Sequence, residues 1–347
     1  MLSCGLQKTA PGGGAGWRSG GRLRRLLYIS VVLPTYERLA ILRRCLDRLA
    51  AQSVPLGDFE VLVVDDASRE PVAPSLEPIY RDGPLQVRWL RVEPNNPARA
   101  RNVGLDEARG RLVLFLGDDV LALPNLLEEH LAVHRRTPDS AACLCRLETD
   151  PELLGTPFQR FFDPFGFSRL RGDQELGPRY FWTNNVSLKT AFLRTHGRFD
   201  EEFPDANHED IELGYRLHRR GMRLHYRDRL VGYHHHRYTL DSACRLLYRR
   251  GETYHVLRSK VPDAVFRESL GIFSWRSRPR AVARGLARAA LFNDLTAPAW
   301  KRWLERDRES WLRRALYWKL LTYHTNKGFR DARPKRRGGL RPAETAG

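Results

Sequence analysis

The sequence predicts an α/β fold, a mostly parallel sheet flanked by helices, followed by a helical arm. Three short apolar runs, Ser30–Leu33, Phe59–Val64 and Leu112–Leu116, are typical of strands that are buried on both faces. Amphipathic segments separate these runs, and such a series favours right-handed crossovers between parallel strands. At 347 residues the chain can hold one large domain with an appendage, or two modest domains.

The first part of the chain continues this alternation. Apolar residues recur at helical spacing over Leu39–Gln52, which predicts a helix after the first strand. Pro71–Pro84 is rich in proline, and we expect it to be irregular. A third strand is expected at Val87–Val92. A helix is expected over Pro97–Arg109, with a proline in its first turn and Gly110 after its end.

The middle of the chain carries one more strand and helix before a long loop. Helical spacing predicts a helix over 126–134, and Ala141–Leu147 is typical of a strand. The stretch Phe158–Gly177 is rich in aromatic residues and glycine, and we expect a long surface loop. Long loops of compact domains often act as lids. Another strand is expected at Phe181–Leu188.

The next part returns the chain to the sheet and then becomes helical. Short helices are expected over 190–197 and 207–221, the second with acidic residues in its first turn and arginines and a glycine at its end. Two strands, Arg223–Arg227 and Leu230–His236, should follow. Beyond Thr239 apolar residues lie on one side of a basic helix.

The domain organisation follows from these elements. We expect a flexible basic tail at 1–27, an α/β domain at 28–238, a helical region at 239–329 and a disordered tail at 330–347. Four tryptophans recur in the helical region, and packing between helices explains them better than a sugar platform: Trp300, Trp303, Trp311 and Trp318.

Composition restricts the classes of partner and compartment. The formal charge of +18 comes mainly from arginine, which allows a polyanionic partner without requiring one. Five cysteines without a CxxC pair favour a reducing compartment. Cys143 and Cys145 share one face of a predicted strand; buried free thiols are favoured over a metal pair, because further ligands at zinc spacing are missing. The sequence lacks a membrane-spanning run and a signal peptide core, which favours the cytoplasm.

Three acidic pairs are expected to converge at one edge of the sheet: Asp65 and Asp66, Asp118 and Asp119, and Glu209 and Asp210. Two pairs follow predicted strands at the edge where open α/β folds bind ligands, and oxygen ligands suit Mg²⁺ or Mn²⁺. Sugar transfer from a nucleotide diphosphate needs carboxylates for the nucleoside, the metal and the acceptor proton. Taken alone, each pair could also be a turn or a helix start.

Five motifs occur in a fixed order over about residues 29–238. They are VVLPTYER, VLVVDDAS, ARARNVGLDEARGRLVLFLGDDV, TNNVSL with GRFDEEF, and HEDIELGYRLHRRG. In this order they resemble the inverting family 2 glycosyltransferases with the GT-A fold, a Rossmann-like sheet flanked by helices. The resemblance therefore implies a GT-A domain with a C-terminal helical arm.

The resemblance also implies roles for individual residues. Those assigned to donor binding are Pro34, Thr35, Glu37, Asp65, Asp66, Arg101, Asn102 and Asp118. Asp119 and His234 would hold the metal, and Asp210, with Glu209 beside it, would accept the proton. Strand alternation places His234 and His236 on one face and His235 on the other. Gly117 stands where many relatives have the first acid of a D-x-D triplet.

The function implied is a metal-dependent inverting transfer of a sugar from a UDP- or GDP-linked donor to an acceptor hydroxyl, with Mn²⁺ or Mg²⁺. The acceptor would be a glycan or a lipid-linked molecule in cell-surface polysaccharide or glycoconjugate synthesis. The basic arm could contact an anionic membrane at its inner, cytoplasmic face, whereas nucleic acid is not favoured. The sequence names neither the base, the sugar nor the acceptor.

The sequence is also compatible with two other functions. A nucleotidyltransferase also places acids and a metal beside a nucleotide, but no glycine-rich basic loop follows the first strand here. An inactive basic protein that binds nucleic acid or a membrane surface is the second alternative. The presence of every expected acid except one at Gly117 argues against it.

Overall fold

The computed structural model describes residues 28–270, 291–306 and 310–332. The predicted tail at 1–27 lies outside the described residues, as do residues 333–347 of the predicted C-terminal tail. Within the described part, a nine-stranded sheet has the order β3-β2-β1-β4-β8-β6-β9-β5, and β7 pairs with β9. The predicted α/β fold is confirmed.

The first four strands of this order are parallel: β1 (Ile29–Thr35), β2 (Phe59–Asp66), β3 (Val87–Val92) and β4 (Leu112–Leu116). All residues of β2 and β4 are buried, as their continuous apolar runs require. Because parallel strands end at the same edge, β1, β2 and β4 place their following loops side by side. That edge carries most of the predicted site.

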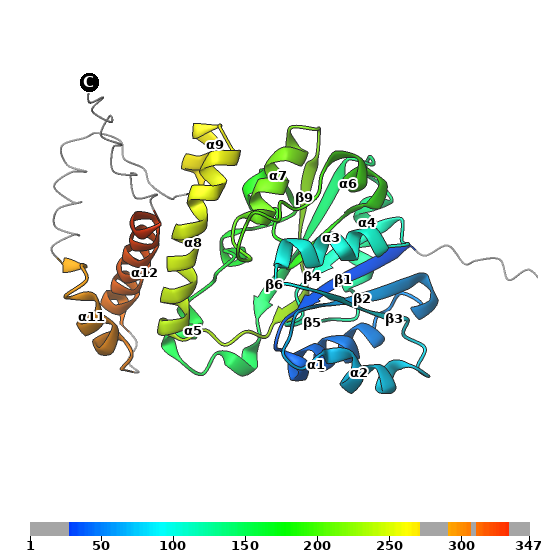
Figure 1. The fold of residues 1–347 in the computed structure, drawn as a ribbon, viewed down its shortest axis with the longest axis horizontal. Helices are drawn as coiled ribbons and strands as arrows, with labels where there is room; N and C mark the ends of the chain where they lie inside the picture. Colours follow the sequence, from blue (N-terminus) through cyan, green and yellow to red (C-terminus); the bar gives the residue numbers. More distant parts are fainter. Residues whose placement is uncertain (1–27, 271–290, 307–309, 333–347) are drawn as a thin grey trace, which may run out of the picture.

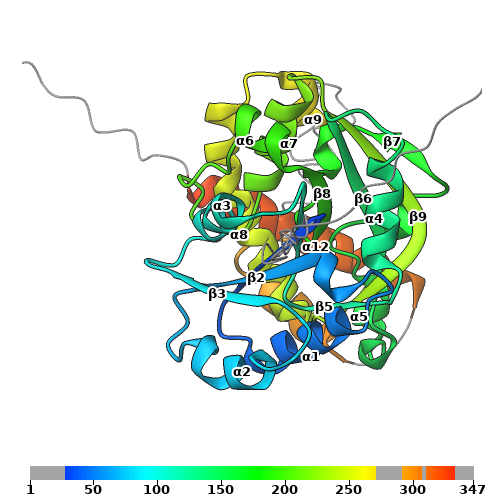
Figure 2. The same cartoon turned by 90° about the vertical axis from the view of Figure 1, so that its right-hand side faces the viewer.

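The second half of the sheet is mixed. The strands are β5 (Val120–Ala122), β6 (Ala141–Thr149), β7 (Gln174–Leu176), β8 (Asn185–Lys189) and β9 (Arg223–His234). Strand β8 lies antiparallel between β4 and β6, while β9 is parallel to β6 and antiparallel to β5 and β7. Figure 2 shows β2 and β3 towards one edge of the sheet and β6 and β9 towards the other edge.

Helices cover the sheet and extend it at one end. Those of the sheet domain are α1 (Leu39–Ala50), α2 (Val72–Tyr80), α3 (Pro97–Glu107), α4 (Leu126–His134), α5 (Pro157–Phe161), α6 (Thr190–His196) and α7 (Glu209–His218). In Figures 1 and 2, α1 and α2 lie on one side of the sheet and α3 and α6 on the other. The core therefore has three layers.

The predicted irregular stretch Pro71–Pro84 is wrong, because α2 forms there. Val72, Leu76 and Tyr80 follow one another at four-residue spacing and are all buried. Their burial outweighs the main-chain hydrogen bond that Pro78 removes inside the helix.

The predicted surface loop Phe158–Gly177 is also wrong. It contains most of α5, the single-turn helix Phe167–Arg169 and β7. Its aromatic residues Phe158, Phe162 and Phe167 are buried. Its aromatic content therefore reflects packing into the core rather than a free loop.

The two strands predicted over 223–236 form one strand, β9, which ends at His234. Its pairing with β6 shifts register around Arg146, so the ladder passes through a bulge instead of ending. The predicted strand Phe181–Leu188 is shorter at its start, since β8 begins at Asn185.

The arm consists of α8 (Leu240–Lys260), α9 (Ala264–Ser269), α11 (Ala297–Leu304) and α12 (Trp311–Asp331). Figure 1 shows α8, α11 and α12 beside the sheet domain. Helices α8 and α12 approach closely at Gly251 and Gly328, where a Cβ on either glycine would overlap the main chain of the other helix.

The arm also packs on the sheet domain. Phe158 and Phe162 share a hydrophobic cluster with Tyr317 and Leu320 of α12. The division of the chain at residue 238 stays a prediction. Among the described helices, none is both long and apolar enough to cross a bilayer.

Candidate active site

Asp118 and Asp119 lie in the turn between β4 and β5, at the carboxyl edge of the parallel strands. Asp118 is 5% exposed, and the hydroxyl of Thr35 donates a hydrogen bond of 2.7 Å to its Oδ2. Burial and the charge of Asp119 raise the pKa of Asp118 to about 6. A Cβ at Gly117 would lie 2.9 Å from Oδ1 of Asp119, so the glycine makes room for this carboxylate.

Two histidines converge on Asp119. His234 Nε2 lies 3.3 Å from its Oδ1, and His236 Nδ1 lies 3.1 Å from its Oδ2. As strand alternation predicts, His235 points elsewhere, with its Nδ1 2.7 Å from Asp150 Oδ2. Backbone pairing fixes the arrangement, because Val120 is the register partner of His234. The three side chains offer ligand atoms within 4.8 Å of one another.

Arg38, which precedes α1, was not predicted for this site. Its Nη1 lies 3.1 Å from Asp118 Oδ1 and 2.5 Å from Asp119 Oδ2. Burial opposes ionisation of Asp119, but His234, His236 and Arg38 outweigh it and hold the pKa of Asp119 well below its usual value.

These residues fit a divalent cation. One ionised carboxylate and two imidazoles form a nitrogen and oxygen donor set that Mn²⁺ accepts, and Mg²⁺ would rely more on the oxygens. The position of Arg38 shows that the space beside both carboxylates already accommodates positive charge.

The loops after β1 and β2 contact each other beside this pair. Glu37 has φ of 56°; its backbone N–H donates to Ser68 Oγ at 2.9 Å, and its Oε1 accepts from the N–H of Arg69 at 2.8 Å. Pro34 and Thr35 end β1 and pair in register with Val64 and Asp65 of β2. The structure thus brings the predicted nucleoside residues to one edge.

The two acids of β2 differ in what they hold. Asp65 accepts hydrogen bonds from the N–H of Ser68 at 2.9 Å and from Arg91 Nη1 at 2.8 Å, so it braces its own loop. Asp66 accepts from the N–H of Asn96 at 2.7 Å and from Asn95 Nδ2 at 3.1 Å. Both carboxylates are 3% exposed.

A second charged group lies at the start of α7. Arg101 Nη1 is 2.9 Å from Glu209 Oε1, and Glu209 is 2% exposed, with no partner for its Oε2 in the described part of the chain. Burial and the charge of Asp210 raise the pKa of Glu209 to about 8, although Arg101 opposes the shift.

Asp210 is partly exposed, unlike Glu209. Its Oδ2 accepts a long hydrogen bond of 3.4 Å from the N–H of Thr183. Burial raises the pKa of Asp210, while Arg101 lowers it and Arg250 of α8 also lowers it. Asp210 is therefore the more accessible base of the pair.

Arg250 was not singled out by the sequence. Burial lowers the pKa of its guanidinium, and the charges of Asp210, Tyr238 and Glu209 oppose that effect. In the part of the chain that the structure describes, no hydrogen bond or ion pair of this guanidinium is found. The group at Asp119 and Arg250 both act on Tyr238. The centre of its ring is 4.3 Å from that of His236, and the charge of Arg250 opposes the rise that burial causes in the pKa of its hydroxyl.

Asn102 is the predicted residue that the structure turns away from the site. It is 2% exposed; its Nδ2 donates to Phe199 O at 3.0 Å and to Glu201 Oε1 at 2.9 Å, and its Oδ1 accepts from the N–H of Phe199. All its polar atoms are thus engaged in holding α3 against residues 199–201.

Comparison with known proteins gives one family. Residues 30–195 match the family model described as Glycosyl transferase family 2. A validoxylamine A glucosyltransferase of Streptomyces hygroscopicus subsp. jinggangensis is 34% identical over 221 residues, covering 56% of this chain and 52% of that enzyme. A hyaluronan synthase of Pasteurella multocida is 27% identical over 278 residues, covering 70% of this chain and 28% of that protein. This chain thus spans about half the length of the glucosyltransferase and about a quarter of the length of the hyaluronan synthase.

Solved structures share the fold. The crystal structure of S. aureus TarS 1–349 in complex with UDP has a TM-score of 0.51 and 21% identity, covering 89% of this chain and 93% of that one. The mannosyltransferase PcManGT of Pyrobaculum calidifontis, in complex with GDP-Man and Mn²⁺, has a TM-score of 0.55 and 15% identity, with 86% of each chain covered. At these identities the likeness establishes the GT-A fold alone.

Proposed function

We propose that the chain, whose residues 30–195 match the glycosyl transferase family 2 model, is a glycosyltransferase of this family that moves a sugar from a nucleotide-diphosphate sugar to an acceptor hydroxyl with inversion. The observation that carries the proposal is the grouping of Asp119, His234 and His236 at the carboxyl edge of the sheet. Asp210 is the partly exposed acid of a second charged group, and the charge of Arg250 acts both on Asp210 and on Tyr238, whose ring lies beside His236.

Donor binding would use the edge formed by β1, β2 and β4. The loops at Glu37 and Asp66 would hold the base and ribose, with Pro34, Thr35 and Asp65 shaping the loops, and Asp118 would face the ribose or the sugar. Arg101, which is paired with Glu209 in the second charged group, would attract the phosphates of the donor. Asn102 would act by holding α3 in place.

The cation would be held by Asp119, His234 and His236. When bound, Mn²⁺ or Mg²⁺ neutralises the charge that develops on the departing diphosphate. TarS with UDP and PcManGT with GDP-Man and Mn²⁺ support a donor of this class, with uracil or guanine as the base.

Asp210 would act as the general base. Its carboxylate takes the proton of the acceptor hydroxyl as that oxygen bonds to the anomeric carbon. The bond from the anomeric carbon to the diphosphate breaks on the opposite side, so the configuration inverts. Glu209 would stay beside it as a neutral or Arg101-paired acid, which avoids two adjacent free charges.

The acceptor class is supported by the relatives. The hyaluronan synthase and a chondroitin synthase of Escherichia coli suggest a glycan or lipid-linked acceptor in polysaccharide or glycoconjugate synthesis. We place the protein in the cytoplasm, with peripheral contact to the inner face of an anionic membrane through the basic arm.

Calorimetric titration of UDP and GDP, each with and without Mn²⁺, tests the proposal. Wild-type protein should bind one diphosphate in a Mn²⁺-dependent manner, Asp119→Ala should lose that dependence, and Asp82→Ala at an exposed position should behave as wild type. If neither nucleotide binds under any condition, the donor site is not functional. Metal-independent binding of equal strength in wild type and Asp119→Ala would refute the assignment of the cation.

A further inference from the structure

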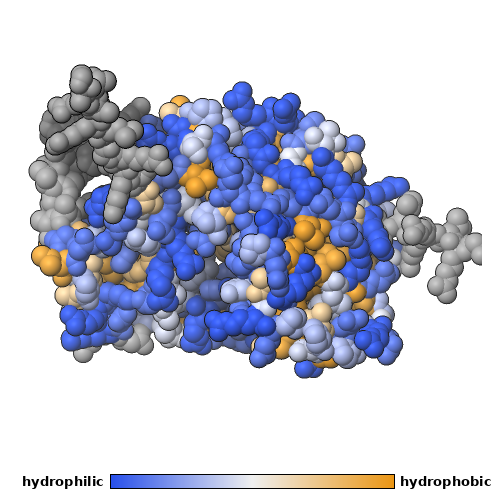
Figure 3. All heavy atoms as spheres, in the orientation of Figure 1, coloured by the Kyte–Doolittle hydropathy of each residue, from blue (hydrophilic) through white to orange (hydrophobic). Residues whose placement is uncertain are grey.

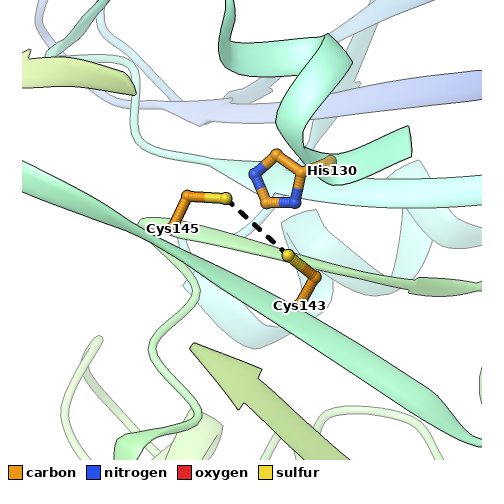
Figure 4. Close-up of side chains that lie close together, drawn as sticks. All are labelled: His130, Cys143 and Cys145. Atoms are coloured by element: carbon orange, nitrogen blue, oxygen red, sulfur yellow. Dashed lines mark hydrogen bonds between the residues drawn. The ribbon is translucent and has the colours of Figure 1, made fainter. Parts of the chain in front are cut away.

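A buried cluster of two thiols and an imidazole lies under α4, apart from the acidic edge. Cys143 and Cys145 of β6 and His130 of α4 are each 0% exposed. Figure 4 shows the ring of His130 reaching from the helix toward both sulfur atoms. The two Sγ atoms are 3.7 Å apart, so both cysteines are free thiols.

The local structure explains why these side chains meet. Residues two apart on a strand point to the same face, which brings Cys143 and Cys145 together. Cys143 pairs in register with Ser187 of β8 on one side and with His225 of β9 on the other. Helix α4 packs on this face and presents His130.

Hydrogen bonds fix the tautomer of His130. Asn185 Nδ2 donates to Cys145 O at 3.1 Å, which leaves its Oδ1 to accept from His130 Nε2 at 2.8 Å. His130 Nδ1 then carries the lone pair and accepts a hydrogen bond from the hydroxyl of Ser187 at 2.8 Å, a bond that a metal ion on this nitrogen would replace. A ligating histidine usually donates its other N–H in this way to a carbonyl oxygen.

A second imidazole, that of His134, lies one turn further along α4. His134 Nε2 is 2.8 Å from Ser187 Oγ, which already donates to His130, so Nε2 of His134 must donate. Its Nδ1 therefore also carries a lone pair. His134 is 4% exposed, and among the described residues this Nδ1 has no hydrogen-bond partner. A buried, unpartnered imidazole nitrogen is an uncommon feature that a metal would satisfy.

We propose that Cys143, Cys145 and His130 bind a thiophilic metal ion, with Zn²⁺ the best fit; His134 lies outside this group of ligand atoms and would have to move to serve as a fourth ligand. With Zn–S bonds of about 2.3 Å and tetrahedral angles, two thiolates lie about 3.8 Å apart, which matches the observed 3.7 Å. The same separation suits a thiol hydrogen bond, so the imidazoles are what favour a metal. Binding would release the two thiol protons.

This site differs in chemistry from the acidic edge. The group that offers ligand atoms within 4.8 Å here is His130, Cys143 and Cys145, without a carboxylate. Soft sulfur ligands select zinc or copper(I), whereas the oxygen-bearing group at Asp119 suits Mn²⁺ or Mg²⁺. Access from outside is supported by a cavity of about 340 Å³ lined by Val133 of α4 and by His225 and Arg227 of β9, the strand next to the cysteines.

A metal here would be structural. It would fasten α4 to β6, and α4 directly follows the segment that carries Asp118, Asp119 and β5. The inference is independent of the sugar-transfer proposal, since it requires neither a nucleotide nor an acceptor.

Cobalt titration of the reduced, untagged full-length protein tests the site. We expect a sulfur-to-cobalt charge-transfer absorption that saturates near one ion per chain, that persists in Asp119→Ala, and that is lost in the Cys143→Ser/Cys145→Ser double variant. Cys244→Ser removes another buried thiol, in α8, and should leave the absorption unchanged. Absence of the band in wild type, or its persistence in the double variant, would overturn the proposal.

A second measurement avoids the risk that the double variant misfolds. X-ray absorption of zinc-loaded Asp119→Ala protein, in which the other cation group is disabled, should show two sulfur neighbours at about 2.3 Å and nitrogen at about 2.0 Å. A shell of oxygen and nitrogen alone would show that the thiols do not bind the ion.

Discussion

Glu209 and Asp210 are neighbours in the chain, but they differ in their exposure to solvent and therefore in their suitability as the proposed general base. Glu209 is buried and paired with Arg101, whereas Asp210 is partly exposed and accepts hydrogen bonds from the N–H groups of Ile211 at 2.7 Å and Thr183 at 3.4 Å. An incoming hydroxyl can reach a partly exposed carboxylate but not a buried one. The two neighbouring acids thus differ in accessibility rather than in type.

Replacing Asp210 by Asn should separate chemistry from binding. The amide keeps the shape but does not accept the proton, so the transfer rate should fall by about 10²- to 10⁴-fold. Calorimetry should show unchanged binding of the diphosphate that wild type prefers. Glu202→Gln, at an exposed acid of the preceding loop, is the control and should retain full rate. A normal rate in Asp210→Asn would assign the base elsewhere.

Arg250→Ala should shift the pH dependence of the reaction. The charge of Arg250 lowers the pKa of Asp210, so its loss lets that pKa rise. Because the base must be ionised, the acidic limb of kcat/KM should move to higher pH, by up to about one unit. Arg249→Ala removes the same charge from the same helix, but at a residue that faces Asp205, and should leave the profile in place. A shift to lower pH would contradict the assignment.

The sequence predicted most acidic residues of the site, but it did not identify Arg38 and Arg250, two of the arginines that act on them. The pairs at 65–66, 118–119 and 209–210 stand out because each follows a strand or begins a helix. Arg38 and Arg250 could not be recognised, since each is one arginine among many and only the fold shows which ones face acids. His236 had a signal, its two-residue spacing from His234, which places both on the same side of the chain.

At the level of helices, the arm depends on two close approaches. Gly251 in α8 and Gly328 in α12 sit where each helix meets the main chain of the other. Larger residues would move the axes apart, because backbone atoms cannot rotate away as side chains do.

Gly251→Ala or Gly328→Ala should therefore destabilise the protein although alanine favours helices. We expect the free energy of unfolding, measured by denaturant titration, to fall by about 1–3 kcal/mol for each. Gly177→Ala is the matched control, because a Cβ there meets nothing within 4 Å and its φ of −71° suits alanine. Stability equal to that of the control would show that the helices can shift without cost.

Element prediction failed where tertiary packing overrode a local signal. Pro74 and Pro78 suggested an irregular segment, but both proline positions are tolerated once Val72, Leu76 and Tyr80 are buried. The short strand β5 has three residues and no pattern of its own, so only its partner β9 defines it. Strong alternating or continuous apolar runs, such as Phe59–Val64, were identified correctly because their burial is local information.

At the scale of the whole molecule, positive charge and exposed apolar residues occur together on the arm. The formal charge of +18 belongs to the whole chain. The arm contributes Lys301, Arg302 and Arg314 among its basic residues, and Leu295 and Trp311 there are 91% and 80% exposed. Figure 3 shows a mostly hydrophilic surface with hydrophobic patches, one at the edge formed by the arm and a larger one over the sheet domain. This combination is typical of surfaces that bind anionic membranes.

Vesicle sedimentation tests this contact. The protein should bind phosphatidylglycerol vesicles at low salt, and binding should be lost at high salt because the attraction is screened. Leu295→Ser with Trp311→Ser should weaken it, whereas Ile79→Ser, at an exposed apolar residue of α2, should not. Equal binding to phosphatidylcholine vesicles, or none at low salt, would rule the contact out.

The pairing of β5 with β9 has a consequence for how such a protein can diversify. Val120 opposite His234, and the N–H of His235 donating to the carbonyl of Asp119 at 2.8 Å, set the spacing of the cation group through the main chain. The loops that would recognise the base follow β1 and β2, which are not part of the β5–β9 pair. The loops after β1 and β2 could therefore be exchanged to change donor selectivity, while the β5–β9 pairing keeps the cation group in place.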